Sequence, residues 1–277
     1  MRVQIGLRGD LFRFGVADRL FADAGAGSGL RWKAIASPKA SLAVRVSQGT
    51  TLFANFGDGF HSNDARDVLL APSHATVLPR AVGAELGFRA LGTRGSLAAA
   101  LWRMDLESEL VYDGDAGTTE TSGRTLRYGG DAEARLLVTP WLWADLDVSL
   151  AHGRFRDEPS GANRIPLAPT LTATGGFTVR GLAGASGGVR FRHVGQRPAT
   201  PDNAVVARGY TITECFARRP VKRLEFGLAV DNLFGVAWNE AQFATTSRLR
   251  GEPTPITELH FTPGAPRAVQ VSVAYAL

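Results

Sequence analysis

The residues with the most reactive side chains are five histidines and one cysteine, and their spacing matches no catalytic motif. Cys215 has no second cysteine with which to form an internal disulfide, and the histidines are scattered at positions 61, 74, 152, 193 and 260. The sequence contains no Gly-x-Ser-x-Gly, no phosphate-binding loop and no zinc-ligand spacing. A serine hydrolase needs a serine, a histidine and an orienting third group within reach of one another. We therefore expect no enzymatic activity, no cofactor and no metal site.

Strand-like alternation of apolar and polar residues runs through the chain. An extended chain points successive side chains to opposite faces, so such segments have one apolar and one polar face. The clearest examples are residues 79–91 (PRAVGAELGFRAL), 141–150 (WLWADLDVSL), 224–230 (LEFGLAV) and 268–277 (AVQVSVAYAL). In residues 97–112 we expect Trp102, Met104 and Leu106 on the apolar face and Arg103, Asp105 and Glu107 on the polar face.

The connections between these segments are of two alternating lengths. Short turns are predicted at 48–50, 92–95, 139–141, 182–185 and 220–223, and long polar segments around 19–29, 61–78, 113–124, 157–164, 198–206 and 239–264. Tight turns at one end and long loops at the other are typical of bacterial outer-membrane barrels. We therefore predict an all-β fold, an antiparallel transmembrane β-barrel with about twelve strands in this chain.

Composition is compatible with this fold. It argues against a helical membrane protein and against a nucleic-acid-binding protein. The longest uninterrupted apolar run, Leu97–Trp102, is far shorter than the roughly 20 residues of a transmembrane helix. The net charge of +5 comes from scattered arginines and not from a basic patch, so we expect no nucleic-acid partner. A soluble β-sandwich or propeller stays open, although no blade-like repeat of 40–45 residues is visible.

Two stretches carry a family resemblance. The sequence VDNLF (230–234) ends one strand and is followed by a long polar segment and a closing strand. The stretch SPKASLAVRVSQGTTLFANFGDGFHS (37–62) has the pattern of a hairpin. In order and spacing they resemble the C-terminal part of a TonB-dependent outer-membrane receptor, over essentially the whole chain. Such receptors have a 22-stranded barrel with an internal plug. We therefore expect residues 1–277 to be the C-terminal barrel region of a longer or split receptor, with the plug domain absent.

The resemblance implies TonB-energised uptake of a scarce, bulky nutrient, such as a ferric siderophore, cobalamin or an oligosaccharide, across the bacterial outer membrane. The implied partners are outer-membrane lipid and lipopolysaccharide, the TonB complex through the missing plug, and a small-molecule or metal-chelate ligand. Charged and aromatic side chains of the long segments are the candidate ligand-binding residues. They are Arg248, Arg250, Glu258, His260, Trp238 and Phe243 in or beside segment 239–264, and Phe60, His61 and Asn63 after FGDGF.

Each candidate has a plainer interpretation. Arg248 and Arg250 fit better as partners of acidic loop residues such as Glu252, or of lipopolysaccharide phosphates, than as ligand contacts. Trp238 and Tyr112 fit an aromatic belt at the membrane interface. We expect a set of charged residues to face the barrel interior as a hydrated ion-pair lattice and not as a proton relay: Arg103, Asp105, Glu107, Asp145 and Asp147.

Two further expectations concern assembly. Leu277 stands where receptors of this family usually end in Phe, so we expect weaker recognition by the assembly machinery and a larger membrane-inserted fraction for Leu277→Phe. The rival to a receptor fragment is a self-contained barrel of about twelve strands that acts as a passive channel.

Overall fold

The computed structural model describes residues 1–17, 29–62, 77–113 and 118–275, so Asn63 and Leu277 lie outside the described residues. Twelve long strands form one antiparallel sheet in which each strand pairs with the next long strand of the chain. They are β1 (Arg2–Val16), β2 (Gly29–Arg45), β3 (Thr50–Phe60), β4 (Arg80–Gly92), β5 (Gly95–Leu106), β8 (Thr125–Thr139), β9 (Leu142–Phe155), β10 (Leu171–Leu182), β11 (Ala185–Val194), β14 (Tyr210–Val221), β15 (Leu224–Asp231) and β18 (Ala268–Tyr275). The prediction of an all-β chain with about twelve antiparallel strands is confirmed.

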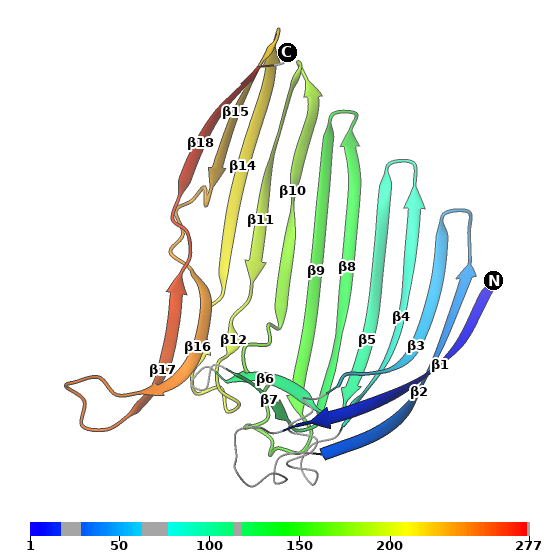
Figure 1. Cartoon of the computed structure of the whole chain (residues 1–277). Helices are drawn as coiled ribbons and strands as arrows, with labels where there is room; N and C mark the ends of the chain where they lie inside the picture. The colour runs from blue at the N-terminus through cyan, green and yellow to red at the C-terminus, as the bar shows by residue number, and fades with distance from the viewer. Residues whose placement is uncertain (18–28, 63–76, 114–117, 276–277) are drawn as a thin grey trace.

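The sheet is strongly curved and open, with β1 and β18 at its two edges (Figure 1). Strand pairing in the described residues ends at these edges, and β1 and β18 do not pair with each other. No helix among the described residues is long and apolar enough to cross a membrane.

The two ends of the sheet differ as the sequence predicts (Figure 1). We call them the turn end, where β2–β3, β4–β5, β8–β9, β10–β11 and β14–β15 are joined tightly, and the loop end. Ala183 and Gly184 form one of the tight turns with φ of 51° and 76°. Two consecutive positive φ angles are those of a type I′ turn, which matches the twist of the flanking strands.

Three of the long connections contain short two-stranded hairpins of their own. These are β6 (Glu109–Asp113) with β7 (Thr118–Ser122), β12 (Arg197–Pro198) with β13 (Val206–Ala207), and β16 (Asn239–Ser247) with β17 (Ile256–Pro263). The predicted polar loop 239–264 is therefore mostly an ordered β-hairpin, which projects beyond the loop end of β18 (Figure 1).

The pairing register separates an apolar face from a polar face across the whole sheet. One row on the apolar face contains Leu86, Leu101, Gly130, Leu150 and Leu171, on β4, β5, β8, β9 and β10. Large side chains on this face are open to the surroundings, with Leu101 70% exposed and Leu86 63% exposed. The neighbouring rows on the polar face contain Asn55, Glu85, Asp131, Asp145 and Asp147.

The sequence-based assignment of Arg103 and Asp105 to the polar face is wrong. Trp102 pairs with Glu85 and Gly129, so Trp102, Met104 and Leu106 are on the polar face. Arg103 and Asp105 therefore follow Leu97, Ala99 and Leu101 on the apolar face, nearest the loop end. The predicted alternation itself is confirmed. The apolar band ends at Leu101, and beyond it charged residues lie on the apolar face and apolar residues on the polar face. Glu107 lies just past β5, where its carboxylate accepts a 2.9 Å hydrogen bond from the backbone N–H of Arg80.

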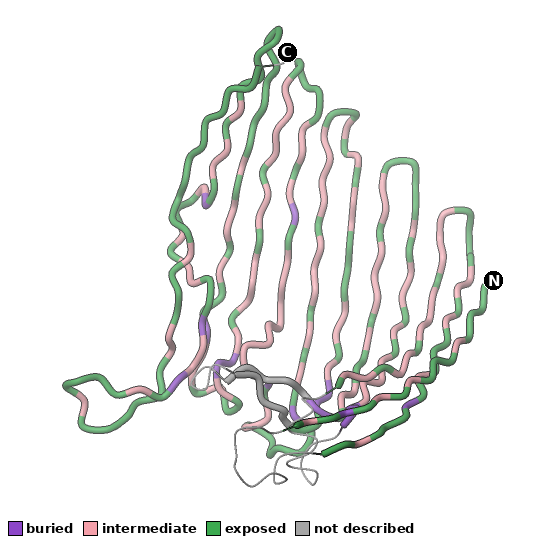
Figure 2. Tube along the Cα trace, viewed as in Figure 1, coloured by how far each residue is buried: buried purple, intermediate pink, exposed green. Residues whose placement is uncertain are grey.

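Burial is concentrated at the loop end and not in a central core (Figure 2). The buried apolar residues include Phe14, Ile35, Val77 and Leu78, which form one cluster between the β1–β2 hairpin and the segment before β4. A soluble sandwich would bury one face of each sheet against the other. Here the apolar rows face outward from a single layer, as a membrane barrel requires.

Candidate functional site

A buried asparagine positions the polypeptide at the loop end of β15. Asn232, in the VDNLF motif, is 3% exposed and adopts a φ of 48°, which Asn tolerates better than most residues. Its side-chain amide donates to the carbonyls of Val236 (2.8 Å) and Ala265 (3.4 Å), and its side-chain oxygen accepts from the N–H of Val236 (2.8 Å). These bonds join the two ends of the connection that carries β16 and β17, so the motif fixes the base of the hairpin.

An arginine and two aromatic rings meet beside this base. The rings of Tyr210 and Trp238 lie 4.8 Å apart between centroids. The guanidinium carbon of Arg192 lies 5.7 Å from the Tyr210 centroid and 5.4 Å from the Trp238 centroid. Register places Arg192 and Tyr210 on the polar face of β11 and β14. Trp238 therefore packs against polar-face residues, and its interpretation as an interfacial belt residue is wrong.

A cavity of about 770 Å³ adjoins Trp238 at the base of the hairpin. Its lining combines two arginines, Arg208 and Arg267, with Trp238 and Phe261. The Gln242 side chain holds β16 over this region through hydrogen bonds to the backbone N–H (2.8 Å) and carbonyl (2.9 Å) of Arg208. Cations and aromatic rings around one cavity suit an anionic ligand with planar groups.

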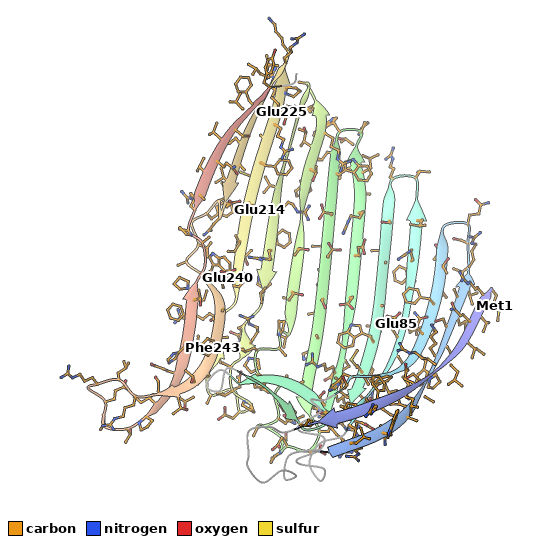
Figure 3. The ribbon with its side chains drawn as sticks, viewed as in Figure 1. Met1, Glu85, Glu214, Glu225, Glu240 and Phe243 are labelled. Carbon is orange, nitrogen blue, oxygen red and sulfur yellow. The ribbon has the colours of Figure 1, made fainter. Side chains whose placement is uncertain are left out.

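The hairpin brings together three of the sequence-predicted site residues. Phe243 pairs with His260 in register, and their ring centroids are 6.1 Å apart. The Nε2 atom of His260 lies 3.3 Å from the Ser247 hydroxyl and 3.8 Å from a carboxylate oxygen of Glu258. Figure 3 shows Glu240 and Phe243 on this hairpin, far along the sheet from Glu85, which lies on β4 toward the N-terminal edge.

Arg248 and Arg250 lie at the hairpin tip, away from Trp238. The Arg248 guanidinium donates a 2.9 Å hydrogen bond to the backbone carbonyl of Glu252, whose carboxylate accepts from the N–H of Leu249 at 2.8 Å. Arg248 is thus held within the turn by the residue that the plainer interpretation names, although the contact is to the main-chain carbonyl of Glu252 and not to its carboxylate. Arg250 is exposed.

Phe60 and His61 are not part of this group. Seven strands of the main sheet separate β3, which Phe60 ends, from β15. The Phe60 ring packs edge-on against Phe12 with centroids 5.5 Å apart, beside the buried cluster of the β1–β2 hairpin. The backbone N–H of His61 donates to the carbonyl of Pro79 at 3.2 Å. Their contacts are those of packing at the loop end.

The polar face carries an ion-pair lattice, as the sequence predicts for Asp145 and Asp147. Arg135 donates two 3.0 Å hydrogen bonds to Asp147, and Arg190 donates two of 2.8 Å to Asp145. A groove of about 330 Å³ lies next to this lattice and is lined by Phe53, Arg89, Asp131, Glu133, Ser149 and Thr174 among others. No group of three metal-ligating side chains occurs in the part of the chain that the structure describes.

Arg192 and Tyr210 are not among the residues predicted from the sequence. The alternation of "VRFRHV" (189–194) could have placed Arg190 and Arg192 on one face. The approach of Trp238, which lies 46 positions after Arg192, depends on the path of the 232–238 segment and leaves no local signal.

Comparisons with known proteins agree with this architecture. The family model for the TonB dependent receptor-like beta-barrel matches residues 1–233. No curated protein matches the sequence. Three similar solved structures are the ferric-catecholate import receptor Fiu from E. coli K12 (TM-score 0.72, 18% identity), the ferric yersiniabactin uptake receptor FyuA from Yersinia pestis (0.68, 15%) and the siderophore receptor PiuA from Acinetobacter baumannii (0.72, 15%).

These alignments cover 98%, 89% and 99% of this chain but only 42%, 38% and 40% of the three structures, so the chain spans about two fifths of their length. At such identities the likeness shows the fold. The family match covers most of the chain and agrees with the open sheet, its outward apolar face and its two unequal ends. The chain therefore belongs to the TonB-dependent receptor β-barrel family of the bacterial outer membrane.

Proposed function

We propose that this chain forms the ligand-capturing wall of a receptor for TonB-energised uptake of a scarce, bulky nutrient, and that a ferric siderophore fits it better than cobalamin or an oligosaccharide. One observation carries the proposal: Arg192, Tyr210 and Trp238 form a cation–aromatic cluster on the polar face at the loop end. In this family the loop end is the outer side of the membrane, so a ligand arriving from outside meets this cluster first.

Charge supports the choice among the three nutrient classes. Arg208 and Arg267 add two positive charges beside Trp238. An anionic metal chelate gains from both arginines and rings, whereas a neutral sugar uses the rings alone. The similar structures include receptors for ferric catecholates and ferric yersiniabactin. Phe243 and His260, on the adjoining hairpin, extend the proposed contact surface, and Arg250 at its tip is the outermost candidate.

Two kinds of partner belong to the proposal. The open edges of β1 and β18 require further strands, because unpaired backbone groups are not tolerated in hydrocarbon. We propose that these strands, and the plug through which the TonB complex acts, come from polypeptide other than the described residues. Outer-membrane lipid and lipopolysaccharide cover the apolar face.

Ligand titration of the full chain, inserted in outer-membrane vesicles, tests the proposal. The probes are a ferric tris-catecholate, cyanocobalamin and maltoheptaose, and the readout is quenching of tryptophan fluorescence. We expect saturable binding of the ferric probe, which Arg192→Gln weakens about tenfold, as loss of one charge-assisted contact of about 1.4 kcal/mol implies. Arg219→Gln, on the apolar face at the turn end, is the matched control and leaves binding unchanged.

Three results would contradict the proposal. One is failure of every probe to bind, another is equal binding to the Arg192→Gln variant, and the third is steady passive current. A planar-bilayer recording of the same vesicles after fusion detects the third result, which favours the self-contained passive channel. Tighter binding of cyanocobalamin or maltoheptaose would keep the receptor and overturn the choice of a siderophore.

A further inference from the structure

We infer that the outward face of β5, β8 and β9 contains a specific binding site for one lipopolysaccharide molecule, with its phosphate at an arginine patch and an acyl chain in the groove beneath. The inference rests on the proposed orientation of the sheet in the outer membrane, with the loop end outside, and not on uptake of a nutrient. It begins with the unexpected position of Arg103 and Asp105 on the apolar face.

The arginine patch consists of Arg103, Arg124, Arg154 and Arg156, with the carboxylates of Asp105 and Asp157. Asp105 accepts hydrogen bonds from both Arg103 (2.9 Å) and Arg156 (3.0 Å). Arg154 pairs in register with Leu126, which pairs with Asp105, so Arg154 faces the same side. Arg124 pairs with Asp157 at 2.5 Å. Four arginines and two aspartates leave the patch an excess of two positive charges.

One further carboxylate on this side of the sheet is directed elsewhere. Glu107 follows Asp105 on the same side of β5, but its carboxylate accepts the N–H of Arg80. Arg103 and Arg156 are 61% and 46% exposed, so both guanidinium groups are open to an approaching anion. Arginine binds phosphate through paired N–H donors. The N–H groups of Arg103 and Arg156 that donate to the Asp105 carboxylate can donate to phosphate oxygens in the same way.

A groove lies directly under the patch. In register, the row Arg103–Tyr128–His152 is followed toward the turn end by the row Leu101–Gly130–Leu150 and then by Ala99–Ala132–Val148. The small residues Ala99, Gly130 and Ala132 form a floor between the larger Leu86, Leu101 and Leu150, and the groove holds about 540 Å³. Its apolar lining lies within the band that meets hydrocarbon, so an acyl chain is the ligand that fits.

Two exposed rings mark the boundary between patch and groove. The rings of Tyr128 and His152 lie beside each other, with centroids 5.6 Å apart and planes tilted by 32°, and Tyr128 is 48% exposed. Aromatic side chains with a polar group are favoured where hydrocarbon gives way to headgroups. The order from the loop end is therefore cationic patch, amphipathic rings and apolar groove, which matches phosphate, sugar and acyl chain of lipid A. The loop end faces the leaflet in which lipopolysaccharide resides, and this location selects it over inner-leaflet phospholipid.

The test measures lipopolysaccharide retained by the purified full chain after detergent washing, with phosphatidylglycerol as competitor. We expect the Arg103→Gln/Arg156→Gln double variant to retain about tenfold less, as loss of about 1.4 kcal/mol of charge-assisted contact implies. Arg219→Gln, on the same face at the turn end, is the charge control. Ala132→Leu fills the groove without changing charge and also lowers retention, whereas Ala217→Leu on β14 does not.

Asp105→Asn separates the proposal from simple misfolding. This substitution releases both arginines from their carboxylate, so we expect it to raise retention, a gain that a damaged fold does not produce. Equal retention by the double arginine variant and Arg219→Gln, reduced retention by Asp105→Asn, or displacement by phosphatidylglycerol as effective as by lipopolysaccharide would each overturn the site.

Discussion

Arg190 on β11 reaches across β10 to Asp145 on β9, and the two side chains form a pair of hydrogen bonds of 2.8 Å. Gly176 on β10 lies between them in register, where the absence of a side chain leaves the path open. One ion pair thus connects three strands on the polar face. Arg190 is 36% exposed but Asp145 only 13%, so the pair is partly open to water and bears part of the desolvation cost of a buried ion pair.

We expect the Arg190–Asp145 pair to couple in a double-mutant cycle. Asp145 is 13% exposed and Arg190 36% exposed, so the coupling energy is that of a partly exposed pair, about 0.5–1 kcal/mol. Urea unfolding of Asp145→Asn, Arg190→Gln and the double variant in lipid vesicles measures it. Each single variant should lose nearly as much stability as the double variant, and strictly additive losses would show that the contact contributes nothing.

Asn232→Ala should loosen the β16–β17 hairpin. The substitution removes three side-chain hydrogen bonds from a residue that is 3% exposed, which costs about 2 kcal/mol locally. Hydrogen exchange in β16 and β17 measures the loss. The matched control is Asn203→Ala, because Asn203 also has a positive φ, 61°, in the β12–β13 connection. Unchanged exchange in β16 and β17 would contradict the role given to the VDNLF motif.

The link between Arg124 and Asp157 should persist into acid. The hydrogen bond from Arg124 holds the pKa of Asp157 below its ordinary value. A depressed folded-state pKa means that this contribution to stability is fully present above the unfolded value of about 3.9 and is lost as pH falls through the folded value. A carboxyl carbon NMR titration of Asp157 checks this. Arg124→Gln should raise the midpoint, and a wild-type midpoint at or above the ordinary value would contradict the pairing.

Period-two alternation was sufficient to predict the wall. The strands, the tight turns and the outward rows of β4, β9, β15 and β18 follow from side-chain direction, which is a local property of an extended chain. Alternation alone does not say which face meets lipid where charge and apolar residues exchange sides. The faces on which Arg103 and Trp102 lie follow only from the pairing register of β5 with β4 and β8.

The candidate site was predicted less completely than the wall. Trp238, Phe243 and His260 were selected by residue type within a long segment, and the structure places Phe243 and His260 together on one hairpin, with Trp238 at its base. Arg192 and Tyr210 were missed because their partnership with Trp238 joins three separate strands or loops. Phe60 shares its residue type with these aromatic rings but packs in the cluster of the β1–β2 hairpin.

Nitroxide scanning along β9 tests most directly the central claim that one face of this sheet meets hydrocarbon and the other meets water. In a Cys215→Ser background, labels are placed singly at Val148, Ser149, Leu150 and Ala151 of the membrane-inserted chain. Labels at 148 and 150 should collide with dissolved oxygen, and labels at 149 and 151 with a water-soluble nickel chelate. Shielding of 148 and 150 from both reagents would place the apolar face in a dry protein interior and contradict the account.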